Sequence, residues 1–449
     1  MHLIIGKMRW QLSSSIWKHI VSYVNDDIWT IQSLPGASYD LFSGLRAACA
    51  VVELTLHPCT IQTLTRFESF SVWSAGSATV KDDKQDISAI TSCASLHTLN
   101  FISHELRDLS AFAGFPSLHT LDLSSCYGVR ALSALAGCAR LHTLVLSGCL
   151  GVRDIRPLAD CASLHTLDLS CCHEVRDISS LTHCASLRTL HLSACPLVQD
   201  VSALACCASL RALYLNFSPE VRDVSSLASC MNLHTLKLIH CNVCDISALA
   251  GCVSLHTLNL NCCRFVQEVS SLAACLNLHV LDLSCCREIQ DVSALAGCAN
   301  LHTLRLCRCD GVQDISALGG CVSLHTLDLS DCYGVRDVSA LAAAASLHTL
   351  NLSDCVQLRD VSALAGCARL HTLNLSGCIA VRDISALAKS ASLHTLDLSC
   401  CPQVREVSSL GRCVSLHTLH FSVWRPSSTT VNVHGACFYP NSNHRSCGC

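Results

Sequence analysis

Short strand-like alternations of apolar and polar residues recur along most of the chain. In one representative copy, Leu327 and Leu329 alternate with Thr326, Asp328 and Ser330. Side chains two positions apart lie on the same face of a strand. We therefore expect the two leucines to point inward and the three polar residues to point outward.

The alternation returns at a nearly constant interval. Fifteen leucines open successive copies, 23 residues apart except for two intervals of 22: Leu96, Leu118, Leu141, Leu164, Leu187, Leu210, Leu233, Leu255, Leu278, Leu301, Leu324, Leu347, Leu370, Leu393 and Leu416. One copy cannot bury its leucines alone, but stacked copies form a continuous core. The repeat therefore predicts a parallel sheet with one strand per copy, about 4.8 Å apart.

The residues that return to the next strand are too few for a long helix. Asp337 precedes the short apolar stretch 338–341, and its carboxylate suits a helix N-cap or a turn. We expect a 3₁₀ turn or one to two helical turns on the side opposite the strands.

The copy over 324–341 resembles the leucine-rich repeat family, whose pattern is LxxLxLxxN/C followed by a buried aliphatic residue. The resemblance implies an α/β solenoid, a horseshoe with a parallel concave sheet and short 3₁₀ or helical convex segments. The DISAL segments resemble repeats of phosphatase regulators and bacterial internalins. The SLHTLDLSxC segments resemble the cysteine-containing repeats of F-box proteins, and the overall style resembles the expanded repeat families of protozoa such as kinetoplastids.

The pattern divides the chain into four parts. We expect a helical, F-box-like cap over 1–50, degenerate repeats over 51–92, the solenoid over 93–423 and an irregular tail over 424–449. Leu54 and Leu56 keep the repeat spacing in the second part, and Phe70 and Val72 keep part of it.

Residues 12–31 show a helical period of apolar positions. The segment resembles the start of an F-box, although Ser13 and Ser15 replace that motif's proline and acidic residue. The resemblance implies docking to a Skp-type linker and a cullin through Leu12, Ile16, Trp17, Ile20, Val21, Tyr23, Val24 and Ile28. The alternative is an amphipathic helix that caps the apolar edge of the first repeat.

Cysteine is several times more frequent than usual, with 36 of 449 residues. Twelve lie eight residues after an opening leucine and twelve lie three residues before one. This phasing predicts buried packing, because free cysteine is among the most buried residue types. We expect Cys171, Cys262, Cys285 and Cys400, which precede members of the first set, near the surface. A structural zinc site needs a second cysteine pair or histidines beside a CxxC, so no metal and no cofactor are predicted.

Histidine follows the opening leucine in thirteen copies. Stacked imidazoles suggest a metal site or a pH sensor. The alternative, which we favour, is a repeat-consensus residue at the start of each strand, neutral at pH 7.

Composition and charge exclude several classes of protein. Half of the residues are apolar, 14% are charged and the net charge is −4, which argues against a disordered chain and a nucleic-acid binder. No apolar run is long enough for a secretory signal or a membrane span. We therefore expect a cytoplasmic or nuclear protein with reduced thiols and no membrane contact.

The outward strand positions are where a solenoid binds its partner. Most carry serine, aspartate or asparagine, so departures from this background mark a candidate concave-face site for a protein partner: His191, Tyr214, Asn216, Phe217, Lys237, His240, Arg305 and Arg308. The alternative is drift of the repeat sequence.

No catalytic residues are predicted, because the chain has no phosphate loop, GxSxG elbow or HExxH motif. We expect a non-enzymatic scaffold, more specifically an F-box-type substrate adaptor of a ubiquitin ligase. The alternatives are a regulatory subunit of a phosphatase or another enzyme and, disfavoured by the lack of an export signal, a surface adhesin.

Overall fold

The computed structural model describes residues 96–421 apart from Pro116, and the backbone of five short strands outside that range. These strands are β1 (His2–Ile5), β2 (Met8–Gln11), β3 (Glu53–Leu56), β4 (Ser77–Lys81) and β20 (Val431–Asn432). The chain forms two compact units, Met1–Val198 and Gln199–Cys449. Each is described by itself.

The first unit contains seven successive parallel strands, β3 to β9. Its remaining elements are β5 (Thr98–Ile102), η3 (Ser110–Gly114), β6 (Thr120–Asp122), η4 (Ser133–Gly137), β7 (Thr143–Val145), η5 (Arg156–Asp160), β8 (Thr166–Asp168), η6 (Ser179–His183) and β9 (Thr189–His191). Outside this sheet, β1 and β2 pair antiparallel.

The second unit contains ten successive parallel strands, β10 to β19, and β20 pairs antiparallel with β19. Its elements up to β14 are η7 (Ser202–Cys206), β10 (Ala212–Tyr214), η8 (Ser225–Ser229), β11 (Thr235–Lys237), η9 (Ser247–Gly251), β12 (Thr257–Asn259), η10 (Ser270–Ala274), β13 (Val280–Asp282), η11 (Ser293–Gly297) and β14 (Thr303–Arg305). The rest are η12 (Ser316–Gly320), β15 (Thr326–Asp328), η13 (Ser339–Ala343), β16 (Thr349–Asn351), η14 (Ser362–Gly366), β17 (Thr372–Asn374), η15 (Ser385–Lys389), β18 (Thr395–Leu398), η16 (Ser408–Arg412) and β19 (Thr418–Phe421).

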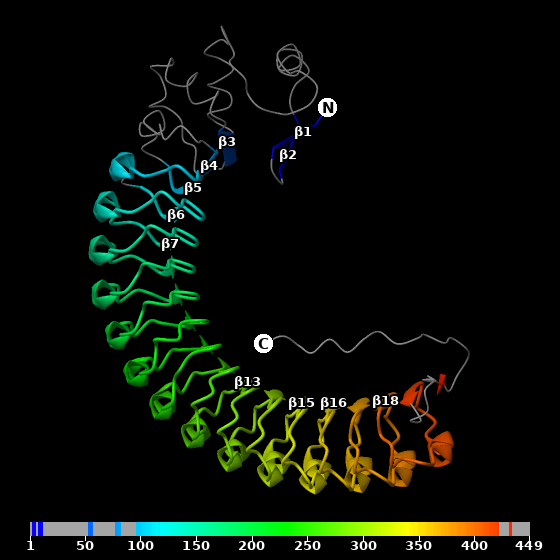
Figure 1. Cartoon of the computed structure of the whole chain (residues 1–449). Coiled ribbons are helices and arrows are strands. Elements are labelled where there is room, and N and C mark those ends of the chain that lie inside the picture. Colours follow the sequence, from blue (N-terminus) through cyan, green and yellow to red (C-terminus); the bar gives the residue numbers. More distant parts are fainter. Residues whose placement is uncertain are drawn as a thin grey trace. The chain divides into compact units, whose positions relative to one another are not determined.

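Within each unit, strands line one face and five-residue 3₁₀ helices line the opposite face (Figure 1). The predicted repeat solenoid of short parallel strands and 3₁₀ turns is therefore confirmed for the described residues. The helices are 3₁₀ because each return segment has room for little more than one turn.

The core lies between these two faces. Leu327 and Leu329 are fully buried, as the strand period predicts. Leu327 aligns with Leu304 on one side and Leu350 on the other, so equivalent leucines form continuous rows. Stacking therefore removes apolar surface from water that one repeat alone would expose.

The degenerate repeats over 51–92 are described only at β3 and β4. Leu54 and Leu56 align with Ala78 and Val80 in parallel register. The spacing predicted the second strand at Phe70 and Val72. The structure instead has it later in the chain, at β4. Of the predicted cap over 1–50 only β1 and β2 are described, and of the predicted tail only β20. The F-box-like segment 12–31 and the boundaries between the four predicted parts lie outside the described residues.

The two cysteine rows join successive repeats. Cys332 Sγ donates to the carbonyl oxygen of Leu306 at 3.0 Å, and Cys321 Sγ donates to that of Leu295 at 3.2 Å. The described members of both rows are buried free thiols. The prediction that they pack in the core is confirmed for these residues.

The prediction for the four preceding cysteines is only half right. Cys171 and Cys400 are exposed, whereas Cys262 and Cys285 are buried. The repeats place Cys285 next to Cys262 and the longer side chain of Arg308 next to Cys285. The longer side chains of His240 and Arg308 flank this pair, whereas the exposed Cys171 lies between Gly148 and Ala194, which are too small to cover it.

Candidate functional site

In the repeats that open with Leu118 to Leu393, the residue seven positions after the opening leucine has a left-handed backbone. In the second unit this conformation occurs at Phe217 (φ 58°), His240 (φ 57°) and Arg308 (φ 58°). Such a backbone costs a residue with a Cβ roughly 1–2 kcal/mol. It is held by hydrogen bonds between repeats, for example from Phe217 N to the carbonyl oxygen of Ile239 at 2.7 Å. Three of the predicted site residues thus occupy a rigid turn.

Tyr214 and Lys237 end neighbouring strands, β10 and β11, in direct register. The Lys237 ammonium nitrogen lies 5.7 Å from the centre of the Tyr214 ring. This distance is typical of a cation–π contact. Both side chains are half-buried, so part of each remains available at the surface.

Phe217 and His240 follow the same two strands. Their rings are stacked, with centroids 5.1 Å apart and planes 18° apart. The Phe217 side chain is 55% exposed despite this contact. We call Tyr214, Phe217, Lys237 and His240 the aromatic–cation patch.

The remaining predicted residues have other surroundings. Asn216 Oδ1 accepts a hydrogen bond from Ile239 N at 3.2 Å, which ties two repeats together. His191 ends β9 in the first unit, in register with Asp168. Neither contact is part of the aromatic–cation patch.

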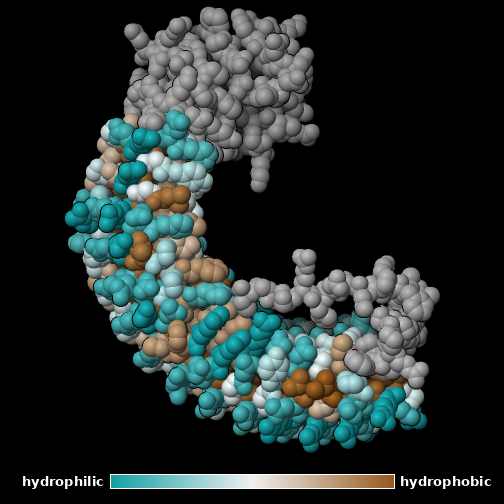
Figure 2. Space-filling model, viewed as in Figure 1, coloured by the Kyte–Doolittle hydropathy of each residue, from teal (hydrophilic) through white to brown (hydrophobic). Residues whose placement is uncertain are grey.

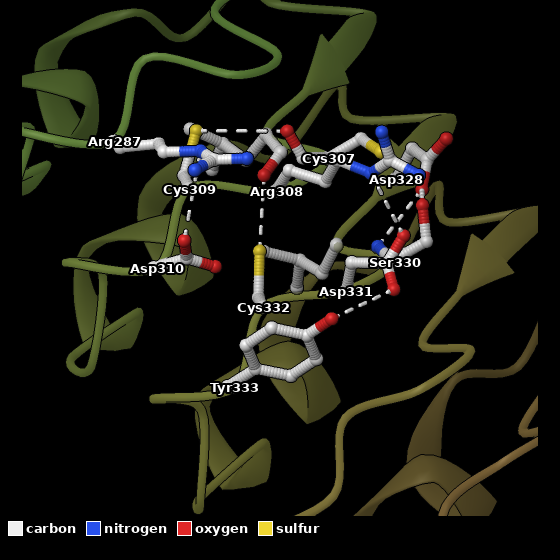
Figure 3. A network of polar contacts seen from close by, with 12 residues as sticks. Arg287, Cys307, Arg308, Cys309, Asp310, Asp328, Ser330, Asp331, Cys332 and Tyr333 are labelled. Carbon is white, nitrogen blue, oxygen red and sulfur yellow. Dashed lines mark hydrogen bonds and ion pairs between the residues drawn. The ribbon is translucent and has the colours of Figure 1, made fainter. Parts of the chain in front are cut away.

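Arg305 and Arg308 come from one repeat but differ in their partners. Arg305 is exposed at the end of β14, between Asp282 and Asp328 in the register of the sheet. Arg308 Nε lies 3.3 Å from Asp331 Oδ2 (Figure 3). The neighbouring carboxylate offsets the charge of Arg308.

Asp331 also accepts a hydrogen bond from the Tyr333 hydroxyl at 3.4 Å (Figure 3). Its negative charge raises the pKa of Tyr333. Sequence reasoning did not single out Asp331 or Tyr333. A signal was present, because Arg308 and Asp331 occupy the same position in successive repeats.

The aspartates on the strands bind their own backbone. Asp328 Oδ1 accepts from the Ser330 amide at 2.9 Å and from its hydroxyl at 2.6 Å. Asp282 similarly accepts from the Ser284 amide at 3.0 Å. The acidic background therefore has a structural role, and the aromatic–cation patch differs from it.

Figure 2 shows hydrophilic residues over most of the visible described surface, with apolar side chains in small separate groups. Exposed apolar residues scattered in this way are normal for a protein surface. They provide no competing large apolar patch on that face.

Among the described residues, no three His, Cys, Asp or Glu side chains are grouped so as to hold a metal ion. Within the same residues, no helix has the length and apolarity needed to cross a bilayer. The F-box-like docking residues Leu12, Ile16, Trp17, Ile20, Val21, Tyr23, Val24 and Ile28 lie outside the described part of the chain.

Two family models match parts of the second unit. The model described as "Leucine Rich repeats (2 copies)" matches residues 345–389, and the model described as "Leucine Rich repeat" matches residues 274–296. No curated protein matches the chain.

Solved structures match over most of the chain. An internalin, InlF, from Listeria monocytogenes is 20% identical, with a TM-score of 0.55 over 81% of this chain and 89% of that chain. A leucine-rich repeat protein from Leptospira interrogans is 14% identical, with a TM-score of 0.57 over 87% of this chain and 100% of that chain. At these identities, the likeness shows a shared fold.

Proposed function

We propose that this chain, a leucine-rich repeat protein, is a non-enzymatic scaffold that binds a partner protein on the strand face of its second unit. The observation that carries the proposal is the aromatic–cation patch. It places two aromatic rings, an ammonium group and an imidazole on a face whose other outward positions mostly carry short polar side chains.

The chemistry of the patch suits a binding hot spot. Hot spots are rich in aromatic and cationic residues that lose contact with water in the complex. Phe217 is more than half exposed, so a partner that covers it buries apolar surface. The left-handed backbone and the ring stack already hold Phe217 in place, which lowers the entropy cost of binding.

Replacing Tyr214, Phe217 and Lys237 together with alanine tests the proposal. We expect the triple variant to lose capture of the partner in affinity purification from the protein's own cells. A matched control carries N351A, D354A and N374A, which are the equivalent positions of two later repeats. Undiminished capture by a folded triple variant would refute the patch.

The finer proposal is an F-box-type adaptor in the cytosol or nucleus, with residues 12–31 docking a Skp-type linker and cullin. It is supported by the resemblance of that segment to an F-box. Affinity purification with and without residues 1–35 tests it. Loss of Skp and cullin on truncation supports the adaptor, and their absence from the full-length sample contradicts it.

The same purification tests a regulatory subunit, which the DISAL segments favour. These segments form the Asp-led turns and 3₁₀ helices opposite the strands, as at Asp314 and η12. A phosphatase captured by both the full-length and truncated chains supports this second function. Capture of no enzyme by either chain argues against it.

A further inference from the structure

Nine histidine rings form a continuous column in the second unit. Neighbouring ring centroids are 4.1–4.8 Å apart. We call these residues the histidine column: His234, His256, His279, His302, His325, His348, His371, His394 and His417. The rings are near-parallel at the end of the column, where the planes of His348 and His371 differ by 6°.

The backbone holds the column in register. After His234, each histidine amide donates to the carbonyl oxygen of the preceding histidine, for example His325 N to His302 O at 2.9 Å. The spacing of the rings is therefore set by the pairing of parallel strands, independently of any attraction between rings. Neighbouring imidazoles therefore stay adjacent even when one of them binds a ligand.

One nitrogen of each ring is directed to the protein. Nδ1 of His302, His325 and His348 lies 3.3–3.4 Å from the hydroxyl of the following threonine. His371 and His394 make the same contact at 3.4 Å. Nε2 of these five rings has no hydrogen bond within the part of the chain that the structure describes. A fixed Nδ1 contact orients the ring and leaves Nε2 as the nitrogen that can bind a ligand.

We propose that adjacent histidines of this column chelate first-row transition-metal ions of the nickel and zinc class, with Nε2 of two successive repeats bound to each ion. Imidazole nitrogen is a preferred ligand of these ions. Water fills the remaining coordination positions, because the described residues supply no third ligand. Nine rings in one column allow up to four such pairs.

Binding requires the two rings of a pair to reorient. Two nitrogens bound to one ion at the usual bond length lie about 3–3.4 Å apart, so the outer ring edges must approach by roughly 1–2 Å. An ion bound by Nε2 lies in the plane of the ring, so the two planes must also open to roughly the N–metal–N angle, about 90–110°. The 39° between His234 and His256 is the widest angle in the column, so binding requires rotation of the two side chains.

Two rings of the column are also held in the protonation state that binds a metal ion. Partial burial and neighbouring imidazoles hold the pKa of His256 and His325 below its ordinary value. At neutral pH these rings are therefore mostly uncharged, and only the neutral imidazole binds a metal ion.

The proposal depends on adjacency, so the experiment compares two full-length variants with the same number of column histidines. The alternating variant carries H256Q, H302Q, H348Q and H394Q, which leaves five rings with no neighbour. The block variant carries H234Q, H256Q, H279Q and H302Q, which leaves five consecutive rings. Both variants and their reference also carry H119Q and H142Q, because the first unit contains a stack of four rings.

Nickel chloride is titrated into each protein by calorimetry at pH 7.5 under reducing conditions, with all cysteines unchanged. We expect the block variant to keep the reference affinity with fewer ions bound. The alternating variant is expected to bind about tenfold more weakly or worse, because it lacks the chelate effect. Equal affinities of the two variants would show that rings bind singly, and weakening of both would show that adjacency is insufficient. Either result overturns the proposal.

A second comparison within the block variant guards against a folding defect in the alternating variant. Adding H371Q to the block variant leaves two adjacent pairs and is expected to leave two bound ions. Adding H348Q and H394Q instead leaves no adjacent pair and is expected to abolish tight binding. Circular dichroism verifies the fold of each protein, and retained tight binding without an adjacent pair contradicts the proposal.

Discussion

At the scale of the residue, hydrogen bonds from individual cysteine thiols link successive repeats. The Cys332 thiol donates to a backbone carbonyl of the preceding repeat, and burial raises its pKa to about 12. It therefore stays protonated at neutral pH and keeps its donor. The phase of the cysteines in the sequence predicted their burial. It did not predict this hydrogen bond, because the acceptor belongs to another repeat.

The histidine column makes stability depend on pH. The pKa of His256, His302 and His325 is lowered from 6.5, first by burial and then by neighbouring imidazoles. Below about pH 6.5 the unfolded chain therefore binds more protons than the folded chain. We expect the melting temperature to fall as the pH is lowered from about 7 to 5, as measured by circular dichroism.

The alternating histidine variant is the control for this pH dependence. Its remaining rings have no charged neighbour in the column when they are protonated, so its melting temperature is expected to fall less over the same range. A melting temperature of the unmodified protein that does not change between pH 7 and 5 would contradict the prediction.

At the scale of the element, an aspartate shapes most of the return segments. Asp360 Oδ1 accepts from the Ser362 amide at 2.8 Å, immediately before η14. This hydrogen bond holds the pKa of Asp360 below its ordinary value. The sequence allowed either a helix N-cap or a turn at this aspartate. The structure has a turn, because Val361 occupies the cap position of η14.

Substitution of Asp360 tests this turn. We expect D360A to lower the free energy of unfolding by about 1 kcal/mol, because the Ser362 amide loses its acceptor. D360N keeps an acceptor oxygen and is expected to cost less. Urea unfolding measures both variants, and equal losses would show that the carboxylate charge matters more than the hydrogen bond.

At the scale of the whole molecule, each repeat contacts its neighbours through the same register. Leu327 pairs with Leu304 on one side and Leu350 on the other. Stability then depends on individual repeats and on the interfaces between neighbours. A whole repeat is therefore a removable unit, whereas part of a repeat is not.

Deletion of one complete repeat, residues 324–346, tests this modularity. The deletion brings Leu350 into the register of Leu327, so we expect an unchanged circular dichroism spectrum and a melting temperature within about 5 °C of the original. Deletion of residues 324–343 is the matched control. It shifts the inward and outward positions of the following repeat and is expected to destabilise the protein much more.

The sequence predicted the candidate-site residues as departures from the repeat. It did not predict which of these residues lie together. Tyr214 and Lys237 share a repeat position, so their proximity follows from the predicted sheet. The stack of Phe217 on His240 depends on the left-handed backbone of both residues. Gly148 and Gly377 occupy the same repeat position with positive φ. Glycine at this position was therefore the available sequence signal for a left-handed backbone.

The sequence by itself determined the repeat, the strand period, the buried leucines and the two cysteine rows, because each depends on regular spacing along the chain. Only the tertiary structure decided that Cys262 and Cys285 are covered, that Arg308 is paired with Asp331, and that the rings of successive histidines stack. These features join residues about one repeat apart. They depend on how side chains of neighbouring repeats fill the space between them, which periodicity alone does not specify.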